Sequence, residues 1–304
     1  MITFFSTPKP FRGHIGVIQR NAIQSWMRVR ADAEVILFGD DEGAAEVARE
    51  FGIRHVPQVE RNEFGTKYVA SIFDRANELA RHELHCYVNC DIVLTEDFAA
   101  ALERVAAWSR MFLMVGRRWD TNITAPLDFA QRDWSARART QALTANRPRS
   151  SEWIDYFAFS RGLYPEIPPL VFGRVAWDRW LVRAARAAGA PVVDASDVVV
   201  AVHQNHDYGY HPAGVQGVWS DEQAQRNFAL AGPARNLHTI DDATHRLTAE
   251  GMRWNPRHLL LPAMRAARPW LMPLWHGLLN LTRPLRHRVG LRQDKLERLA
   301  GRPR

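Results

Sequence analysis

The chain has 304 residues, of which 46% are hydrophobic and 24% charged, and this balance excludes an intrinsically disordered protein. The length suits one large α/β domain or two smaller ones. Residues 253–304 contain twelve Lys/Arg and two acids, whereas residues 1–252 contain 28 basic and 31 acidic groups, a balance of −3. Because the larger part is not a general binder of polyanions, we expect no nucleic-acid partner.

Apolar strands and amphipathic helices alternate along the first part of the chain. The periodicity predicts strands and helices over residues 2–6, 16–29, 34–38, 42–51, 53–56, 67–79 and 84–88, in that order. Helical crossovers of this length join parallel strands, and ligands then bind beyond the C-terminal strand ends. We therefore expect an α/β fold with a mixed, mainly parallel, Rossmann-like sheet flanked by helices. The loops 6–12, 39–41 and 89–91 become candidates for the site.

The alternation is less regular after Asp91. The pattern predicts a helix over 96–108, a strand over 111–115, an apolar segment over 153–159, a helix over 176–188, and a strand over 192–202 that is broken at 195–197. The stretch 117–149 is polar and Arg-rich and receives no assignment. We expect a main domain over residues 1–252 and a helical C-terminal extension over 253–304.

The extension is basic and amphipathic. Its longest apolar stretch, 269–281, is shorter than the roughly 20 residues that cross a bilayer. Two interpretations stay open for residues 259–304: peripheral contact with an anionic membrane, or packing on the chain's own domain or a partner.

The two cysteines, Cys86 and Cys90, are four residues apart in an apolar run. In a strand they would lie about 13 Å apart, too far for a disulfide. The N-terminal residues, which begin directly with the strand 2–6, show no apolar region of a secretory signal, so we expect a cytoplasmic protein. If the extension binds lipid, we expect the protein at the inner face of the cell membrane.

A carboxylate follows the strand 84–88 in the run Tyr87-Val88-Asn89-Cys90-Asp91. Asp91 can hold a divalent cation on a diphosphate, or it can cap the helix that begins near Glu96. Asn89 is expected to bind ribose or to coordinate weakly through its amide oxygen.

Two other carboxylates have unusual surroundings. Asp178 lies in the first turn of a predicted helix, where it can take the proton of an acceptor hydroxyl or simply complement the helix dipole. Asp155 lies between Trp153 and Tyr156 and is expected to hold acceptor hydroxyls.

The run His203-Gln204-Asn205-His206-Asp207 is dense in metal-ligating side chains and follows an apolar strand. We expect one imidazole to join Asp91 in a metal site and the other to contact phosphate or sugar. The spacing does not fit a zinc motif, because the Cys partners and the flanking Glu are missing. Two basic residues, Arg20 and Lys67, suit a diphosphate.

These signals together resemble the glycosyltransferase A fold of the nucleotide-diphospho-sugar transferase superfamily, over about residues 1–210. The resemblance implies that Asp91 binds Mn²⁺ or Mg²⁺ on the donor diphosphate and that Asp178 is the catalytic base. It also implies that His203 or His206 completes the metal site.

The resemblance also implies that Asp40 matches the acid that reads the nucleobase or ribose. Ser6 and Thr7, at the end of the first strand, are further candidates for the donor site. The chain departs from the superfamily pattern at two positions. Asn89 replaces the first acid of Asp-x-Asp, which leaves one carboxylate fewer for the metal, and Trp177 replaces the Glu of a Glu-Asp pair.

The stretches 153–157 and 203–208 are similar to a little-characterised bacterial branch of that superfamily. The expected function is transfer of a sugar, with inversion, from a nucleotide-diphosphate sugar to a glycan or lipid-linked acceptor in glycan or surface polysaccharide synthesis. Two alternatives stay open. A sugar-phosphate nucleotidyltransferase usually has a Gly-rich loop that residues 6–10 lack, and a non-catalytic membrane-associated scaffold would bind no nucleotide.

Overall fold

The computed structural model describes residues 1–145, 147–206, 214–233, 236–261, 263–265 and 267. The chain divides into two compact units, Met1–His258 and Leu259–Arg304. The first unit extends past the expected boundary at residue 252, because the hairpin of β11 (His245–Thr248) and β12 (Gly251–Trp254) crosses that position. None of the described helices has both the length and the apolar character needed to cross a bilayer.

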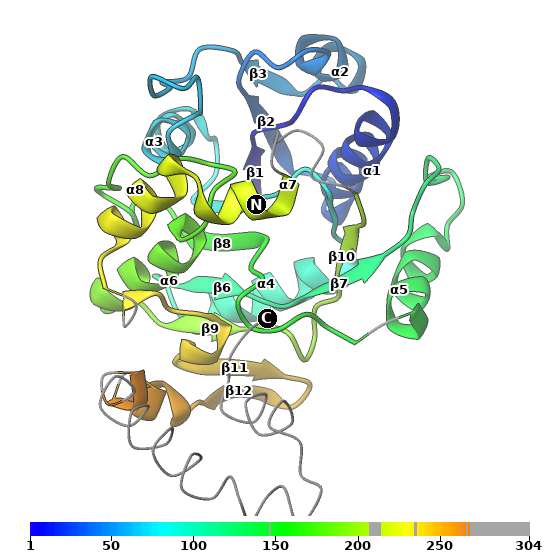
Figure 1. Cartoon of the computed structure of the whole chain (residues 1–304). Helices are drawn as coiled ribbons and strands as arrows, with labels where there is room; N and C mark the ends of the chain where they lie inside the picture. The colour runs from blue at the N-terminus through cyan, green and yellow to red at the C-terminus, as the bar shows by residue number, and fades with distance from the viewer. Residues whose placement is uncertain (146, 207–213, 234–235, 262, 266, 268–304) are drawn as a thin grey trace, which may run out of the picture. The chain divides into compact units, whose positions relative to one another are not determined.

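The main unit is built on a large sheet (Figure 1). Besides the hairpin, its strands are β1 (Ile2–Ser6), β2 (Glu34–Phe38), β3 (Arg54–Val56), β4 (Leu84–Val88), β6 (Leu113–Val115), β8 (Tyr156–Ser160) and β9 (Val192–Asp194). The strand order is β12-β11-β9-β6-β8-β4-β1-β2-β3. The first four strands in the sequence are parallel neighbours, whereas β8 runs antiparallel to both β4 and β6. The predicted α/β fold with a mixed, mainly parallel sheet is confirmed.

Helices cover both faces of this sheet. The described helices of the unit are α1 (Gly13–Val29), α2 (Ala44–Phe51), α3 (Val69–Leu79), α4 (Glu96–Trp108), α5 (Trp134–Ala145), α6 (Trp177–Ala187), α7 (Gly214–Ser220), α8 (Glu222–Ala231) and the 3-10 turn η2 (Ile240–Asp242). Of these, α5 packs on a second, smaller sheet. Successive side chains of a strand point to opposite faces. Phe5 of β1 therefore packs in the core that α3 and α6 cover, and Phe4 packs in the core that α1 and α4 cover.

A second, smaller sheet consists of three short strands. Its strands are β5 (Ile92–Val93), β10 (Ala201–Gln204) and β7 (Arg118–Thr121), in that order. The register places His203 of β10 opposite Ile92 on one side and opposite Asp120 on the other. Residues far apart in the sequence thereby meet just beyond the end of β4.

Several predicted elements coincide with the observed ones, and others were wrong or missed. The predicted ranges 34–38, 84–88 and 96–108 match β2, β4 and α4. The strand 192–202, predicted with a break at 195–197, ends at that break as β9, and its second part belongs to β10 of another sheet; the unassigned stretch 117–149 contains β7 and α5. Both cysteines are free and buried, as expected.

Part of the sequence prediction concerns residues outside the described ranges. These are Asp207 and Tyr208, at the end of the histidine-rich run, and residues 268–304 of the C-terminal extension.

Candidate active site

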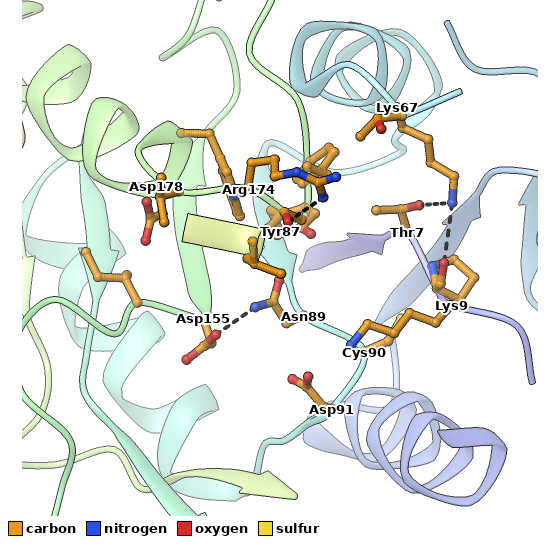
Figure 2. Close-up of a pocket in the computed structure, with 18 of the residues that line it drawn as sticks. Thr7, Lys9, Lys67, Tyr87, Asn89, Cys90, Asp91, Asp155, Arg174 and Asp178 are labelled. Atoms are coloured by element: carbon orange, nitrogen blue, oxygen red, sulfur yellow. Dashed lines mark hydrogen bonds between the residues drawn. The ribbon is translucent and has the colours of Figure 1, made fainter. Parts of the chain in front are cut away.

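A cavity of about 590 Å³ opens beyond the C-terminal ends of β1 and β4, where a parallel sheet is expected to bind its ligand. Figure 2 shows charged side chains directed into it from several loops. The predicted site residues that line it are Thr7, Lys67, Asn89, Asp91, Asp155, Asp178, His203 and His206. A cavity of this size with a few convergent polar groups is typical of a small-molecule site.

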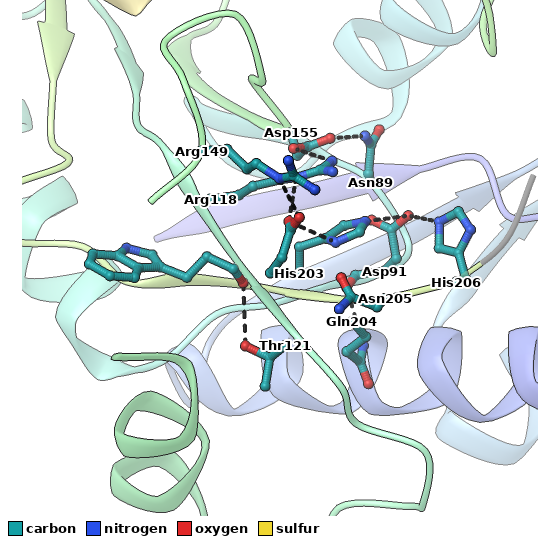
Figure 3. Close-up of polar contacts among 12 residues, drawn as sticks. Asn89, Asp91, Arg118, Thr121, Arg149, Asp155, His203, Gln204, Asn205 and His206 are labelled. Carbon is teal, nitrogen blue, oxygen red and sulfur yellow. Dashed lines mark hydrogen bonds and ion pairs between the residues drawn. The ribbon is translucent and has the colours of Figure 1, made fainter. Parts of the chain in front are cut away.

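Three residues converge at one wall of the cavity (Figure 3). Oδ2 of Asp91 lies 3.0 Å from Nε2 of His206 and 3.8 Å from Nε2 of His203. One ligand atom from each residue lies within 4.8 Å of the other two. The small sheet explains this meeting, since Asp91 immediately precedes β5 and His203 lies in the strand that pairs with it.

The environment of Asp91 fits a cation ligand. Burial would raise its pKa, but the hydrogen bond to His206 and the charges of His203 and His206 outweigh burial and hold the pKa well below its usual value. Its Oδ1 is buried and has no hydrogen-bond partner among the described residues. One carboxylate with two imidazoles suits Mn²⁺ better than Mg²⁺, because Mg²⁺ prefers oxygen ligands.

A buried ion network lies behind the three residues (Figure 3). Oδ1 of Asp120 lies 3.2 Å from Nδ1 of His203 and accepts a 2.9 Å hydrogen bond from Nε of Arg118. Arg118 also donates to Oδ2 of Asp155 at 3.0 Å, and Nδ2 of Asn89 donates to Oδ1 of Asp155 at 2.7 Å. Asp155, expected to hold acceptor hydroxyls, thus has both carboxylate oxygens bonded to protein groups.

Asp178 lines another wall, in the first turn of α6 (Figure 2). Its Oδ1 is shielded from solvent and has no hydrogen-bond partner in the described part of the chain. Burial raises the pKa of Asp178 to about 6. Such a carboxyl group can exchange a proton near neutral pH.

The start of α6 is conformationally strained. Ala176 precedes the first helical residue with a φ of 81°, and in the described part of the chain it is the one non-glycine residue with positive φ. That conformation costs about 1–3 kcal/mol and is concentrated at functional sites. The turn at Ala176 determines where the first turn of α6, with Asp178, meets the cavity.

Lys67 lies at the end of the cavity close to β1. It is 7% exposed, its Nζ donates to Oγ1 of Thr7 at 2.6 Å, and it forms an ion pair with Asp41. Burial lowers the pKa of Lys67, and Asp41 partly offsets that effect. A Cβ on Gly39 would lie 2.7 Å from Cε of Lys67, so glycine leaves space for the lysine side chain.

Three residues expected in the donor site do not line the cavity: Ser6, Asp40 and Arg20. Arg20 instead pairs with Glu50 of α2 at 2.6 Å, and Asp40 is exposed and pairs with Arg61. Ser6 is buried and donates to a backbone carbonyl of β4. The neighbouring Asp41, not Asp40, lines the cavity.

Three charged residues of this region were not predicted from the sequence: Arg118, Asp120 and Arg174. Arg118 and Asp120 alternate with Trp119 and Thr121, a period of two that could have predicted β7 and placed both charges on one face. Arg174 lines the cavity and pairs with Asp221 at 2.6 Å. No local signal distinguishes it from other loop arginines.

No known family profile and no curated protein matches this chain. It resembles the solved glucosyl-3-phosphoglycerate synthase from Mycobacterium tuberculosis in complex with Mn²⁺, UDP-glucose and phosphoglyceric acid, at 14% identity and a TM-score of 0.46, over 75% of this chain and 79% of that chain. It also resembles S. aureus TarS 1–349 in complex with UDP-GlcNAc, at 10% identity and a TM-score of 0.43, over 68% of this chain and 59% of that chain. At such identities and TM-scores the reaction has to be inferred from this chain's own side chains.

Proposed function

We propose that this chain is a glycosyltransferase that moves a sugar from a nucleotide-diphosphate sugar to an acceptor hydroxyl. One observation carries the proposal: the same cavity is lined by Asp91, His203 and His206, which lie close enough together to hold a metal ion, and by Asp178, a carboxyl group of raised pKa. A leaving diphosphate needs positive charge, and an attacking hydroxyl needs a base. A nucleotide site at this edge of a parallel sheet agrees with both needs.

The donor end of the cavity contains the groups for the diphosphate. Asp91, His203 and His206 would hold a divalent cation. Oδ1 of Asp91, which lacks a hydrogen-bond partner within the described part of the chain, supports this assignment. When bound, Mn²⁺ would neutralise negative charge on the diphosphate. Lys67, beside Thr7, supplies a second positive charge in the same cavity.

The reaction that we infer is a direct displacement. The acceptor oxygen bonds to the anomeric carbon, its proton passes to a carboxylate oxygen of Asp178, and the carbon–oxygen bond to the diphosphate breaks, its electron pair staying on the diphosphate. This step inverts the anomeric configuration. A pKa of about 6 leaves Asp178 ionised at neutral pH and makes it a stronger base than an ordinary aspartate.

Calorimetry with UDP, GDP and TDP, each with and without Mn²⁺, tests this function on the full-length protein. A transferase should bind at least one of them more tightly when Mn²⁺ is present, whereas a scaffold should bind none. NMR of the product from the matching sugar nucleotide then reads the anomeric configuration directly. One carboxylate with two imidazoles also holds ferrous iron in oxygenases, so tight Fe²⁺ binding without nucleotide binding would contradict sugar transfer.

We also propose that residues 259–304 bring the enzyme to an anionic membrane, which suits a lipid-linked acceptor in surface glycan synthesis. Ten Lys/Arg against two acids support this, since each basic group near an anionic surface contributes about 1 kcal/mol. The full chain should sediment with vesicles that contain phosphatidylserine and not with neutral ones. Binding that persists after deletion of 259–304 contradicts this role.

A further inference from the structure

The two ring nitrogens of His203 lie near different carboxylates. Nε2 lies 3.8 Å from Oδ2 of Asp91, at the cavity, while Nδ1 lies 3.2 Å from Oδ1 of Asp120. The contact with Asp120 follows from the backbone, because the parallel register of β10 and β7 places the two residues directly opposite each other. The imidazole therefore lies between two carboxylates.

Asp120 is itself held in place. Nε of Arg118 donates to its Oδ1 at 2.9 Å, and Arg149 pairs with its Oδ2. The side chains of Asp120 and Arg118 are 10% and 7% exposed. Arg118 is anchored at its other end, since it donates to Asp155 at 3.0 Å. Because these partners hold the carboxylate of Asp120 in place, the position of the carboxylate determines the orientation of the imidazole ring.

We propose that Asp120 is a positioning residue, which keeps the proton of His203 on Nδ1 and leaves the lone pair of Nε2 directed to the cation site that His203 shares with Asp91. The inference rests on the metal site of the proposed function. In metal sites, a carboxylate that accepts the second N–H of a ligating histidine determines both its tautomer and its ring orientation. Oδ1 of Asp120 is placed for that role, 3.2 Å from Nδ1 of His203, a buried nitrogen that has no hydrogen-bond partner among the described residues, and Asp120 does not itself line the cavity.

A different role for the same contacts is a salt bridge, with His203 doubly protonated between Asp91 and Asp120. The two roles differ in the protonation of Nε2. In the positioning role Nε2 carries no proton and is available to a cation. In the salt-bridge role Nε2 carries a proton and repels a cation.

Nitrogen-15 NMR of the imidazoles in the metal-free full chain at pH 8 separates these roles, with the His203 signal assigned from His203→Gln. We expect a single tautomer with the proton on Nδ1 in the wild type, and a mixture of tautomers in Asp120→Ala. Asp120→Asn should stay close to the wild type, because its amide oxygen can accept the same hydrogen bond. Two protonated nitrogens in the wild type, or an unchanged signal in Asp120→Ala, would overturn the proposal.

Calorimetric titration with Mn²⁺ gives a second readout that needs no turnover. Asp120→Ala should bind Mn²⁺ about 10–100-fold more weakly, with a smaller loss in Asp120→Asn. Asp197→Asn is the matched control, since Asp197 also pairs with an arginine, Arg246, but lies outside the cavity lining. Equal affinity in Asp120→Ala and the wild type refutes the positioning role alone, whereas a wild type that binds no Mn²⁺ refutes the metal site and the positioning role together.

Discussion

Asp91 and Asp178 line one cavity in opposite electrostatic surroundings. At Asp91, the contacts with His203 and His206 outweigh burial and hold the pKa well below its usual value. At Asp178 burial dominates and raises the pKa to about 6. The same type of side chain is therefore a permanent anion at one wall and a titrating group at the other.

This difference divides the chemistry between the two walls. A carboxylate that stays ionised over the physiological pH range is suited to bind a cation, and a carboxyl group poised near neutral pH is suited to accept a proton. Asp178→Asn and Asp91→Asn each change one wall and leave the other as an internal reference.

The largest effect is expected from Asp178→Asn, which removes the base. The turnover number should fall about 10²–10⁴-fold. In the wild type, turnover should rise with pH through about 6, because Asp178 must be ionised to accept a proton, and this limb should be absent from the variant. Donor turnover across this pH range measures both. A near wild-type rate in a variant that still binds Mn²⁺ removes Asp178 as the base.

Asp91→Asn tests the opposite wall. The amide cannot supply the negative charge between His203 and His206, so Mn²⁺ binding should be lost and turnover should fall about 10²–10³-fold. Calorimetry with Mn²⁺ makes the comparison, because Asp178→Asn should leave that binding intact. Equal Mn²⁺ affinities in the two variants would mean that the walls do not have separate roles.

Lys67→Gln is expected to weaken nucleotide binding at the donor end. Loss of one charge-assisted hydrogen bond to a phosphate costs about 1.5–3 kcal/mol, so the Kd for the bound nucleoside diphosphate should rise roughly tenfold or more. Arg20→Gln is the matched control, since Arg20 pairs with Glu50 outside the cavity lining. If both variants weaken binding equally, the effect is one of net charge and not of the cavity.

The smallest effect concerns stability. In the folded protein Asp178 keeps its proton up to about pH 6, whereas in the unfolded chain the carboxyl titrates near its ordinary value of 3.8. Stability therefore falls as pH rises through this window, and the cost is complete above it. Asp178→Asn should stabilise the fold by on the order of 1 kcal/mol at pH 8, with no gain near pH 4. Urea unfolding at the two pH values measures the difference, and an equal gain at both would contradict an ionisation effect.

The sequence by itself determined the layers of the fold and the positions of the two aspartates. Strands such as β2 and β4 and the helix α4 are visible because hydrophobic periodicity is a local property. Asp91 follows from the end of a buried strand and Asp178 from a helix start, which are also local features. The histidine-rich run is conspicuous by composition alone.

Only the tertiary structure decided which charges meet. Arg20 pairs with Glu50 and does not reach the cavity, and Asp41 lines the cavity whereas Asp40 does not. Asp120 lies next to His203, which is 83 positions away in the sequence. Strand order and register bring such partners together, and both depend on contacts that no local pattern encodes. The pKa of each aspartate depends on these distant partners and on burial, so the opposite behaviour of Asp91 and Asp178 required the folded chain.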